Sequence, residues 1–200
     1  MANISQKWLK EMNNSELKVF GIFCNDYNKQ IHGNEIAKQL KMPQRSVLRK
    51  LDNLCNYGVL RYIRIGKNKI YSINWDNPFI FQFLVLAESY KAVNFSLQNP
   101  KIAMILSEIN CGKIIFGSYA KNINTKDSDL DIILLSKEDK KINEIINKSS
   151  IEIHTQFSTK NELRKRLNDG DTLAIEIAKN HIILSNFDDL VKIFMEHYTK

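Results

Sequence analysis

Two short motifs in the second half of this 200-residue chain combine residue types that can bind phosphate and a divalent cation. Gly117-Ser118 comes first, and ten residues separate it from Asp129-Leu130-Asp131. Largely apolar segments at 113–116 and 132–135 flank the motifs and predict buried strands. We therefore expect both motifs at the ends of strands, where loop residues can meet a ligand.

The spacing of the two aspartates predicts a metal site. Successive side chains on a strand alternate between faces, so Asp129 and Asp131 point the same way. Two carboxylates held so near each other are unfavourable unless a positive charge neutralises them. Ligand sets made only of oxygen favour Mg²⁺ or Mn²⁺ over zinc. Gly117 lets the backbone approach a ligand, and the Ser118 hydroxyl at the start of a helix suits a phosphate. A metal pair beside a phosphate cradle is the chemistry of phosphoryl and nucleotidyl transfer.

This pattern of Gly-Ser, ten residues and Asp-x-Asp resembles the nucleotidyltransferase superfamily that includes DNA polymerase beta, the archaeal CCA-adding enzymes and kanamycin nucleotidyltransferase. It is most similar to the minimal nucleotidyltransferases of prokaryotes, and the resemblance covers about residues 100–198. In that family the Gly-Ser turn binds the triphosphate and the two aspartates hold the metals. A third carboxylate comes from a neighbouring strand, and Glu152, between two apolar residues, is the candidate here.

The resemblance implies a role for each site residue. Asp129, Asp131 and Glu152 would be catalytic and would hold Mg²⁺ or Mn²⁺. The nucleoside triphosphate, expected to be ATP, would be bound by Gly117, Ser118, Lys121 and Ser128. Many relatives carry arginine where this chain has Lys121, and lysine keeps the charge but loses the bidentate fork. His154 shares a strand face with Glu152; we expect it to be structural, and the alternative is that it approaches the site.

The charge pattern points to a different role for the first part of the chain. The whole net charge of +7 lies in residues 1–76, because acidic and basic residues balance in 77–200. A basic domain beside a neutral one suggests that the first domain meets a polyanion. The alternative is a lysine-rich surface that is simply solvated.

Residues 12–75 resemble the winged helix-turn-helix domain of transcription regulators. Apolar residues predict a first helix near Leu17, a short helix at 35–40, a second helix ending at Tyr57-Gly58, and two strands, 60–65 and 70–73, around Gly66. The resemblance implies that the second helix of the pair enters the DNA major groove and that the wing grips phosphates. The residues expected to face DNA are Gln44, Arg45, Arg49, Lys50 and Asn53 on the helix, and Arg64, Lys67 and Lys69 on the wing. The alternative is a winged helix that docks a protein instead.

Composition excludes several other classes. The three cysteines, Cys24, Cys55 and Cys111, are odd in number and widely spaced, which argues against a disulfide scaffold or a zinc site and fits a reducing cytosol. The longest apolar stretch is too short and interrupted to span a bilayer, and the N-terminus does not read as a secretory signal. We therefore expect a cytoplasmic protein with no membrane partner.

The full reading is an α+β protein of two domains. Residues 1–76 form the winged helix-turn-helix domain, 77–99 a connecting helix, and 100–200 a polymerase beta-like nucleotidyltransferase domain with a small mixed sheet flanked by helices. In the last domain we expect helices at 160–168, 172–179 and 187–198 and a short strand at 181–184. The expected function is Mg²⁺-dependent transfer of a nucleoside monophosphate to an unknown acceptor hydroxyl, coupled to DNA binding.

Three alternatives stay open. The chain could be a transcription regulator whose second domain only senses nucleotide or is inactive. It could be an antitoxin-like modifier that adenylylates a partner protein. A homodimer across the connecting helix is a further alternative, since winged-helix regulators often pair to read two half-sites.

Overall fold

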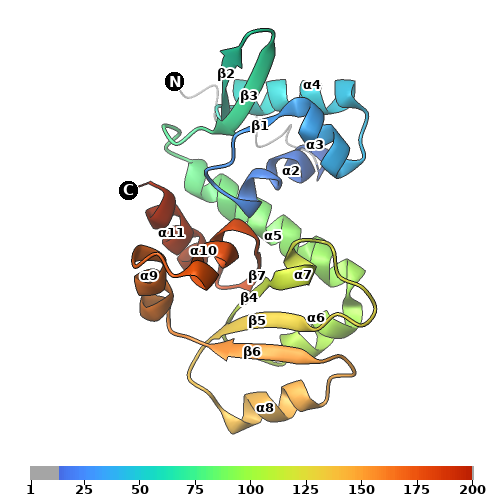
Figure 1. Ribbon diagram of the computed structural model, residues 1–200, viewed down its shortest axis with the longest axis vertical. Helices are drawn as coiled ribbons and strands as arrows, with labels where there is room; N and C mark the ends of the chain where they lie inside the picture. Colours follow the sequence, from blue (N-terminus) through green and yellow to red (C-terminus); the bar gives the residue numbers. More distant parts are fainter. Residues whose placement is uncertain (1–13, 200) are drawn as a thin grey trace. The chain divides into compact units, whose positions relative to one another are not determined.

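The computed structural model describes residues 14–199, which fall into two compact units that divide between residues 87 and 88 (Figure 1). The division falls within one long helix, α5 (Ile80–Gln98). Among the described residues, no helix is long and apolar enough to cross a membrane. Each unit has its own sheet.

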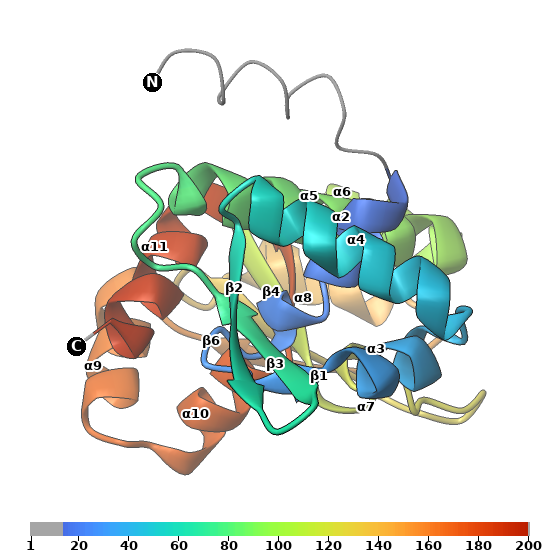
Figure 2. The same ribbon diagram turned by 90° about the horizontal axis from the view of Figure 1, so that it is seen from above.

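The first unit contains three helices and a three-stranded sheet within its described part. Its elements are, in order, α2 (Asn14–Phe20), a 3₁₀ turn (Phe23–Asn25), β1 (Ile31–His32), α3 (Gly33–Leu40), α4 (Gln44–Asn56), β2 (Leu60–Ile65) and β3 (Asn68–Ile73). The strand order is β1-β3-β2 with antiparallel pairing throughout, and Figure 2 shows β2 and β3 as a hairpin with β1 beside it. The predicted pair of helices and the hairpin are thus confirmed as elements. The two-residue strand β1 was not predicted.

The buried face of α4 differs from the prediction at one residue. Val47, Leu51 and Leu54 are fully buried, as their spacing predicts, but Lys50 is also buried, with 7% of its surface exposed. The expectation that Lys50 faces outward toward DNA is wrong. Positions 47, 50, 51 and 54 repeat at the three- and four-residue spacing of one helix face, and the aliphatic stem of a lysine can be buried along it.

The second unit is a mixed four-stranded sheet with helices. After α5 come α6 (Pro100–Ser107), β4 (Gly112–Phe116), α7 (Gly117–Ala120), β5 (Leu130–Leu135), α8 (Lys140–Asn147), β6 (Ile153–Phe157), α9 (Lys160–Asn168), α10 (Thr172–Lys179), β7 (Ile182–Ser185) and α11 (Phe187–Tyr198). The strand order is β6-β5-β4-β7, in which β5 and β6 are parallel and the other two pairs are antiparallel. The predicted helices 160–168, 172–179 and 187–198 are confirmed, the predicted last strand begins one residue later, and α8 was not predicted.

The two faces of β5 have different surroundings. Leu130, Ile132 and Leu134 belong to a buried cluster that includes Leu106 of α6 and Ile145 of α8. Because side chains alternate along a strand, Asp129, Asp131 and Ile133 point to the opposite face. The aspartates of the motif therefore lie on the face away from α6 and α8.

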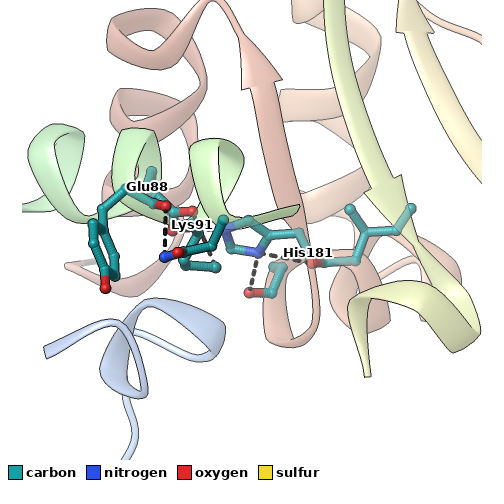
Figure 3. A network of polar contacts seen from close by, with 7 residues as sticks. Glu88, Lys91 and His181 are labelled. Atoms are coloured by element: carbon teal, nitrogen blue, oxygen red, sulfur yellow. Dashed lines mark hydrogen bonds and ion pairs between the residues drawn. The ribbon is translucent and has the colours of Figure 1, made fainter. Parts of the chain in front are cut away.

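A buried polar network fixes the second half of α5 inside this unit (Figure 3). His181, just before β7, lies 3.0 Å from the Glu88 carboxylate through Nε2, while its Nδ1 lies 3.0 Å from the Ile177 carbonyl oxygen. Lys91 lies one helical turn from Glu88 and forms an ion pair with it at 3.0 Å. Glu88 and His181 are completely buried, and the His181 ring packs on Phe194 with centroids 4.4 Å apart. This network ties α5 to α10 and α11.

Candidate active site

The strand register brings four polar side chains together on one face of the sheet. In the parallel pairing of β5 with β6, Asp131 lies opposite His154, and the Leu130 amide donates a hydrogen bond to the Glu152 carbonyl at 2.9 Å. Alternation then places Asp131 in β5, and Asp129 just before it, beside His154 in β6 and Glu152 just before that strand. We refer to these four residues as the carboxylate–histidine cluster. It unites the three acidic residues expected from the sequence.

The imidazole of His154 lies among the three carboxylates. Its Nε2 is 3.2 Å from Glu152 Oε1, and its Nδ1 is 3.7 Å from Asp131 Oδ1 and 4.0 Å from Asp129 Oδ2. Ligand atoms of Asp129, Glu152 and His154 all fall within 4.8 Å of one another. The donors are thus close enough to share one bound cation after small rotations.

The cluster is open to solvent and strongly negative. The exposed fraction of the four side chains ranges from 33% at Asp131 to 71% at Glu152. The hydrogen bond with Glu152, together with the negative charge of Asp129, raises the pKa of the His154 imidazole above its ordinary value. Within the described part of the chain, no lysine or arginine forms an ion pair with the three carboxylates. A divalent cation could therefore enter without displacing a protein cation other than His154.

The Gly-Ser turn lies directly against this cluster. Phe116, the last residue of β4, pairs with Asp131, and the next residue, Gly117, has a φ of +68°, in the left-handed region. A Cβ atom at Gly117 would come within 2.1 Å of Asp131 Oδ2. Glycine is strongly favoured here, because the backbone conformation strains other residues and a Cβ atom would have to displace the Asp131 carboxylate. The turn and the aspartate pair, which the sequence placed ten residues apart, meet in space.

The other two residues expected to bind triphosphate are engaged locally. Lys121 forms an ion pair with Glu176 of α10, with Nζ 2.5 Å from Oε1. The Ser128 hydroxyl accepts a hydrogen bond from the Thr125 amide at 2.8 Å, which closes the loop before Asp129. Ser128 therefore shapes the loop, and Lys121 must leave Glu176 to reach another anion.

His154 is the member of the cluster to which sequence reasoning gave no role in the site. Alternation placed it on the same face as Glu152, but its approach to Asp131 depends on the β5–β6 register. Pairing between strands separated by a helix is not visible in local sequence patterns. The sequence did offer one signal for its position: Ile153 and Thr155 are strand-forming residues, which places His154 within a strand.

The residues expected to contact DNA are distributed unevenly in the first unit. Gln44, Arg45 and Arg49 on α4, and Arg64 and Lys67 on the hairpin, are exposed. A groove between α3, α4 and the hairpin is lined in part by Gln44, Arg64 and Lys67. This side of the unit therefore keeps most of the predicted set accessible.

Three of the predicted residues are engaged within the unit. Lys50 is buried, and Asn53 donates a hydrogen bond to Glu16 at 2.8 Å. Lys69 forms an ion pair with Asp52 at 2.8 Å and lies over the Tyr62 ring, 4.3 Å from its centroid. These contacts stabilise the unit and make the three residues weaker candidates for contact with DNA.

Comparison with protein families supports the chemistry suggested by this geometry. Residues 100–189 match the family described as Polymerase beta, Nucleotidyltransferase. This match supports a nucleotidyltransferase-type domain over residues 100–189. Comparison with curated proteins and with solved structures found no significant match.

The matched segment contains the whole candidate site. It begins at α6, includes the Gly117-Ser118 turn and the carboxylate–histidine cluster, and extends into α11. The mixed sheet and its helices fit the α+β class expected from the sequence. The match supports nucleotidyl transfer in general terms and leaves the acceptor to experiment.

Proposed function

We propose that the second unit moves a nucleoside monophosphate from a nucleoside triphosphate, ATP in the first instance, to an acceptor hydroxyl. The observation that carries this proposal is the contact between the Gly117 turn and the Asp131 carboxylate, inside the segment that matches the family. A phosphate-binding turn and an acidic cluster are useful together only if phosphate and a cation meet there.

The residues present fit a divalent metal. Asp129, Asp131 and Glu152 supply oxygen donors, the ligand type that Mg²⁺ and Mn²⁺ prefer, and among the residues with described positions no lysine or arginine neutralises them. These three side chains would hold the ion, which when bound would neutralise the charge that develops on the phosphates.

The chain's own residues would then orient the reactants. Gly117 would let the triphosphate approach the backbone, and the Ser118 hydroxyl would donate a hydrogen bond to it. The acceptor oxygen would bond to the α-phosphorus as the bond to the β-phosphate oxygen breaks and pyrophosphate leaves. Glu152, the most exposed carboxylate of the cluster, would take the proton of the acceptor hydroxyl.

The test is transfer of label from α-³²P-ATP by the full chain with Mg²⁺ or Mn²⁺, alongside pyrophosphate release. The double variant Asp129→Asn with Asp131→Asn should lower both signals by about 10³-fold, because each change removes a charge that acts in the transition state. Asp127→Asn, an exposed neighbour in the preceding loop, is the matched control and should behave like the parent. No pyrophosphate release with any of the four ribonucleoside triphosphates would count against the proposal.

The same labelling identifies the acceptor. The chain is incubated with cell lysate and labelled ATP. Label in a protein band indicates a modifier of a partner protein, whereas label in nucleic acid indicates a nucleic-acid acceptor. If neither receives label while ATP changes DNA affinity, the alternative of a transcription regulator that senses nucleotide is favoured.

We also propose that the first unit is a winged helix that binds DNA. The support is the charge of +7 in residues 1–76 and the exposed set Gln44, Arg45, Arg49, Arg64 and Lys67 around α4 and the hairpin. The protein-docking alternative predicts no affinity for DNA. The strand order and helix sequence of the unit are compatible with either partner.

DNA binding is tested by measuring affinity against salt concentration. Arg49→Ala and Arg64→Ala should each weaken binding and lower the slope of log K against log salt by about 1. Arg61→Ala is the matched control, because Arg61 lies on the same strand as Arg64 but points to the other face and pairs with Asp76. Equal effects of all three variants would contradict the assignment of this face.

A further inference from the structure

The fold places the backbone of His154 beside the candidate metal site. His154 lies on β6 directly opposite Asp131 in the parallel ladder, and its side chain shares the face of Glu152, two residues earlier. Both relationships follow from the pleat and the register, so they do not depend on a mobile loop. The residue is therefore built into the cluster as firmly as the aspartates are.

The distances suit shared coordination. Two ligands that each lie about 2.1 Å from one octahedral ion are separated by roughly 3 Å when adjacent and by roughly 4.2 Å when opposite. The Nδ1 atom of His154 is 3.7 Å from Asp131 Oδ1 and 4.0 Å from Asp129 Oδ2, within this range. Rotation about χ1 and χ2 of an exposed side chain can supply the remaining adjustment.

We propose that His154 is a direct ligand of the divalent ion, which gives the site a mixed nitrogen and oxygen donor set. This inference rests on the proposed nucleotidyltransferase site, and it adds a nitrogen donor to the three carboxylates inferred there. The neutral imidazole would bind through one ring nitrogen. In the alternative arrangement, His154 is only a counter-cation that the ion displaces.

The consequence is a change in metal preference. Carboxylates alone suit Mg²⁺, whereas an imidazole nitrogen favours later divalent metals of the first transition series, and Mn²⁺ accepts both donor types. The parent protein should therefore bind Mn²⁺ much more tightly than Mg²⁺. Loss of the imidazole should weaken Mn²⁺ binding by at least the roughly 10- to 100-fold seen when an outer-shell partner of a metal is lost, with a smaller effect on Mg²⁺.

Pulsed electron paramagnetic resonance on the full chain loaded with Mn²⁺ alone, without nucleotide, tests this directly. A coordinated imidazole produces a nitrogen hyperfine coupling to the Mn²⁺ electron spin. We expect that coupling in the parent, its loss in His154→Gln, and its retention in the matched control His197→Gln, which changes a histidine of α11. Isothermal titration with Mn²⁺ and Mg²⁺ gives the affinity ratio for the same three proteins, and circular dichroism confirms that they are folded.

The outcomes separate this inference from the proposed function. In one outcome, Mn²⁺ binds to the parent without nitrogen coupling, and the double variant Asp129→Asn with Asp131→Asn loses Mn²⁺ binding. This result overturns the role of His154 and leaves the carboxylate site standing. Coupling that survives in His154→Gln has the same meaning. Failure of the parent to bind Mn²⁺ at all overturns both proposals.

Discussion

The carboxylate of Asp131 fills the space that a side chain at Gly117 would need: a Cβ atom there would lie 2.1 Å from Asp131 Oδ2. The two residues belong to different motifs in the sequence, and β4–β5 pairing brings them into contact. A side chain added to the turn at Gly117 must therefore move the Asp131 carboxylate.

Gly117→Ala should damage the site beyond its effect on the backbone. At a φ of +68° any L-residue is strained by about 1–2 kcal/mol, and here the methyl group must also push Asp131 aside. We expect Mn²⁺ affinity or turnover to fall by roughly 10²-fold, as displacements near 1 Å can do. Gly170→Ala is the matched control, because its φ is +74° and no atom lies within 4 Å of the added Cβ. Equal loss of site function in both variants would show that backbone strain alone is responsible.

Glu88→Ala should destabilise the second unit strongly. Glu88 is fully buried between Lys91 and His181, and its removal leaves the buried His181 and the largely covered Lys91 without that carboxylate. Breaking a buried ion pair from one side costs about 3–5 kcal/mol. Urea unfolding measures the loss, and Glu108→Ala, at an exposed position of the same unit, should change the free energy of unfolding by less than about 0.5 kcal/mol.

The contribution of Glu88 should depend on pH in the acid range. Burial alone would raise the pKa of the Glu88 carboxyl, but Lys91 and His181 outweigh it and hold that pKa below the ordinary value of 4.5. A depressed carboxyl pKa stabilises the fold fully above 4.5, and that contribution is lost as pH falls through the lower folded value. The stability difference between the parent and Glu88→Ala should therefore be constant from pH 5 to 7 and shrink below pH 4.5. A difference that grows on acidification would contradict this ion pairing.

Cys55 should react slowly with alkylating agents at neutral pH. Burial raises the pKa of the Cys55 thiol to about 11 from an ordinary 9.0, although the nearby Lys69 opposes the shift. At pH 8 this reduces the reactive thiolate by about 100-fold. Alkylation followed by mass spectrometry should give a rate at Cys55 that still rises steeply above pH 9.5. A plateau near pH 9 would show that the thiol is not held in a desolvated position.

Releasing Lys121 should favour nucleotide binding. Its partner Glu176 is about half exposed, so the pair contributes at most about 1 kcal/mol to stability. Glu176→Gln should raise ATP affinity a few-fold by removing the competing anion, while Lys121→Ala should lower it. Equilibrium binding of a non-hydrolysable ATP analogue measures both, and unchanged affinity in the two variants would remove Lys121 from the triphosphate site.

Local signals predicted the last third of the fold well. The helix 160–168 is N-capped by Thr159, whose side chain forms a capping box with Glu162. The helix 172–179 is N-capped by Asp171, whose carboxylate accepts a hydrogen bond from the Ala174 amide. Such caps are readable in the sequence because they involve residues three apart. The helix α8 was not predicted, because charged residues interrupt its apolar positions Ile142, Ile145 and Ile146. The strand β1 was not predicted, because two residues are too few to show a pattern.

The proximity of the Gly-Ser turn to the acidic pair was predictable from the sequence, but the full set of neighbouring side chains was not. The spacing of Gly117, Asp129 and Asp131 indicated nucleotidyl-transfer chemistry, because strand alternation and glycine freedom are local properties. The distances from His154 to Asp131 and Asp129 were not predictable, because they arise from the register of two parallel strands joined through α8. Lys50 was expected to face DNA because of its charge, but its position between Val47 and Leu51 places it on the buried face of α4.

The exposure of the carboxylate–histidine cluster has a consequence for any reaction performed there. With 45% of the Asp129 side chain and 71% of the Glu152 side chain uncovered, bulk water reaches the same atoms as an acceptor hydroxyl. Water is then a rival nucleophile, and the isolated chain should hydrolyse triphosphate wastefully until a large acceptor seals the opening. Selectivity for the true acceptor would come from how well it keeps the site dry.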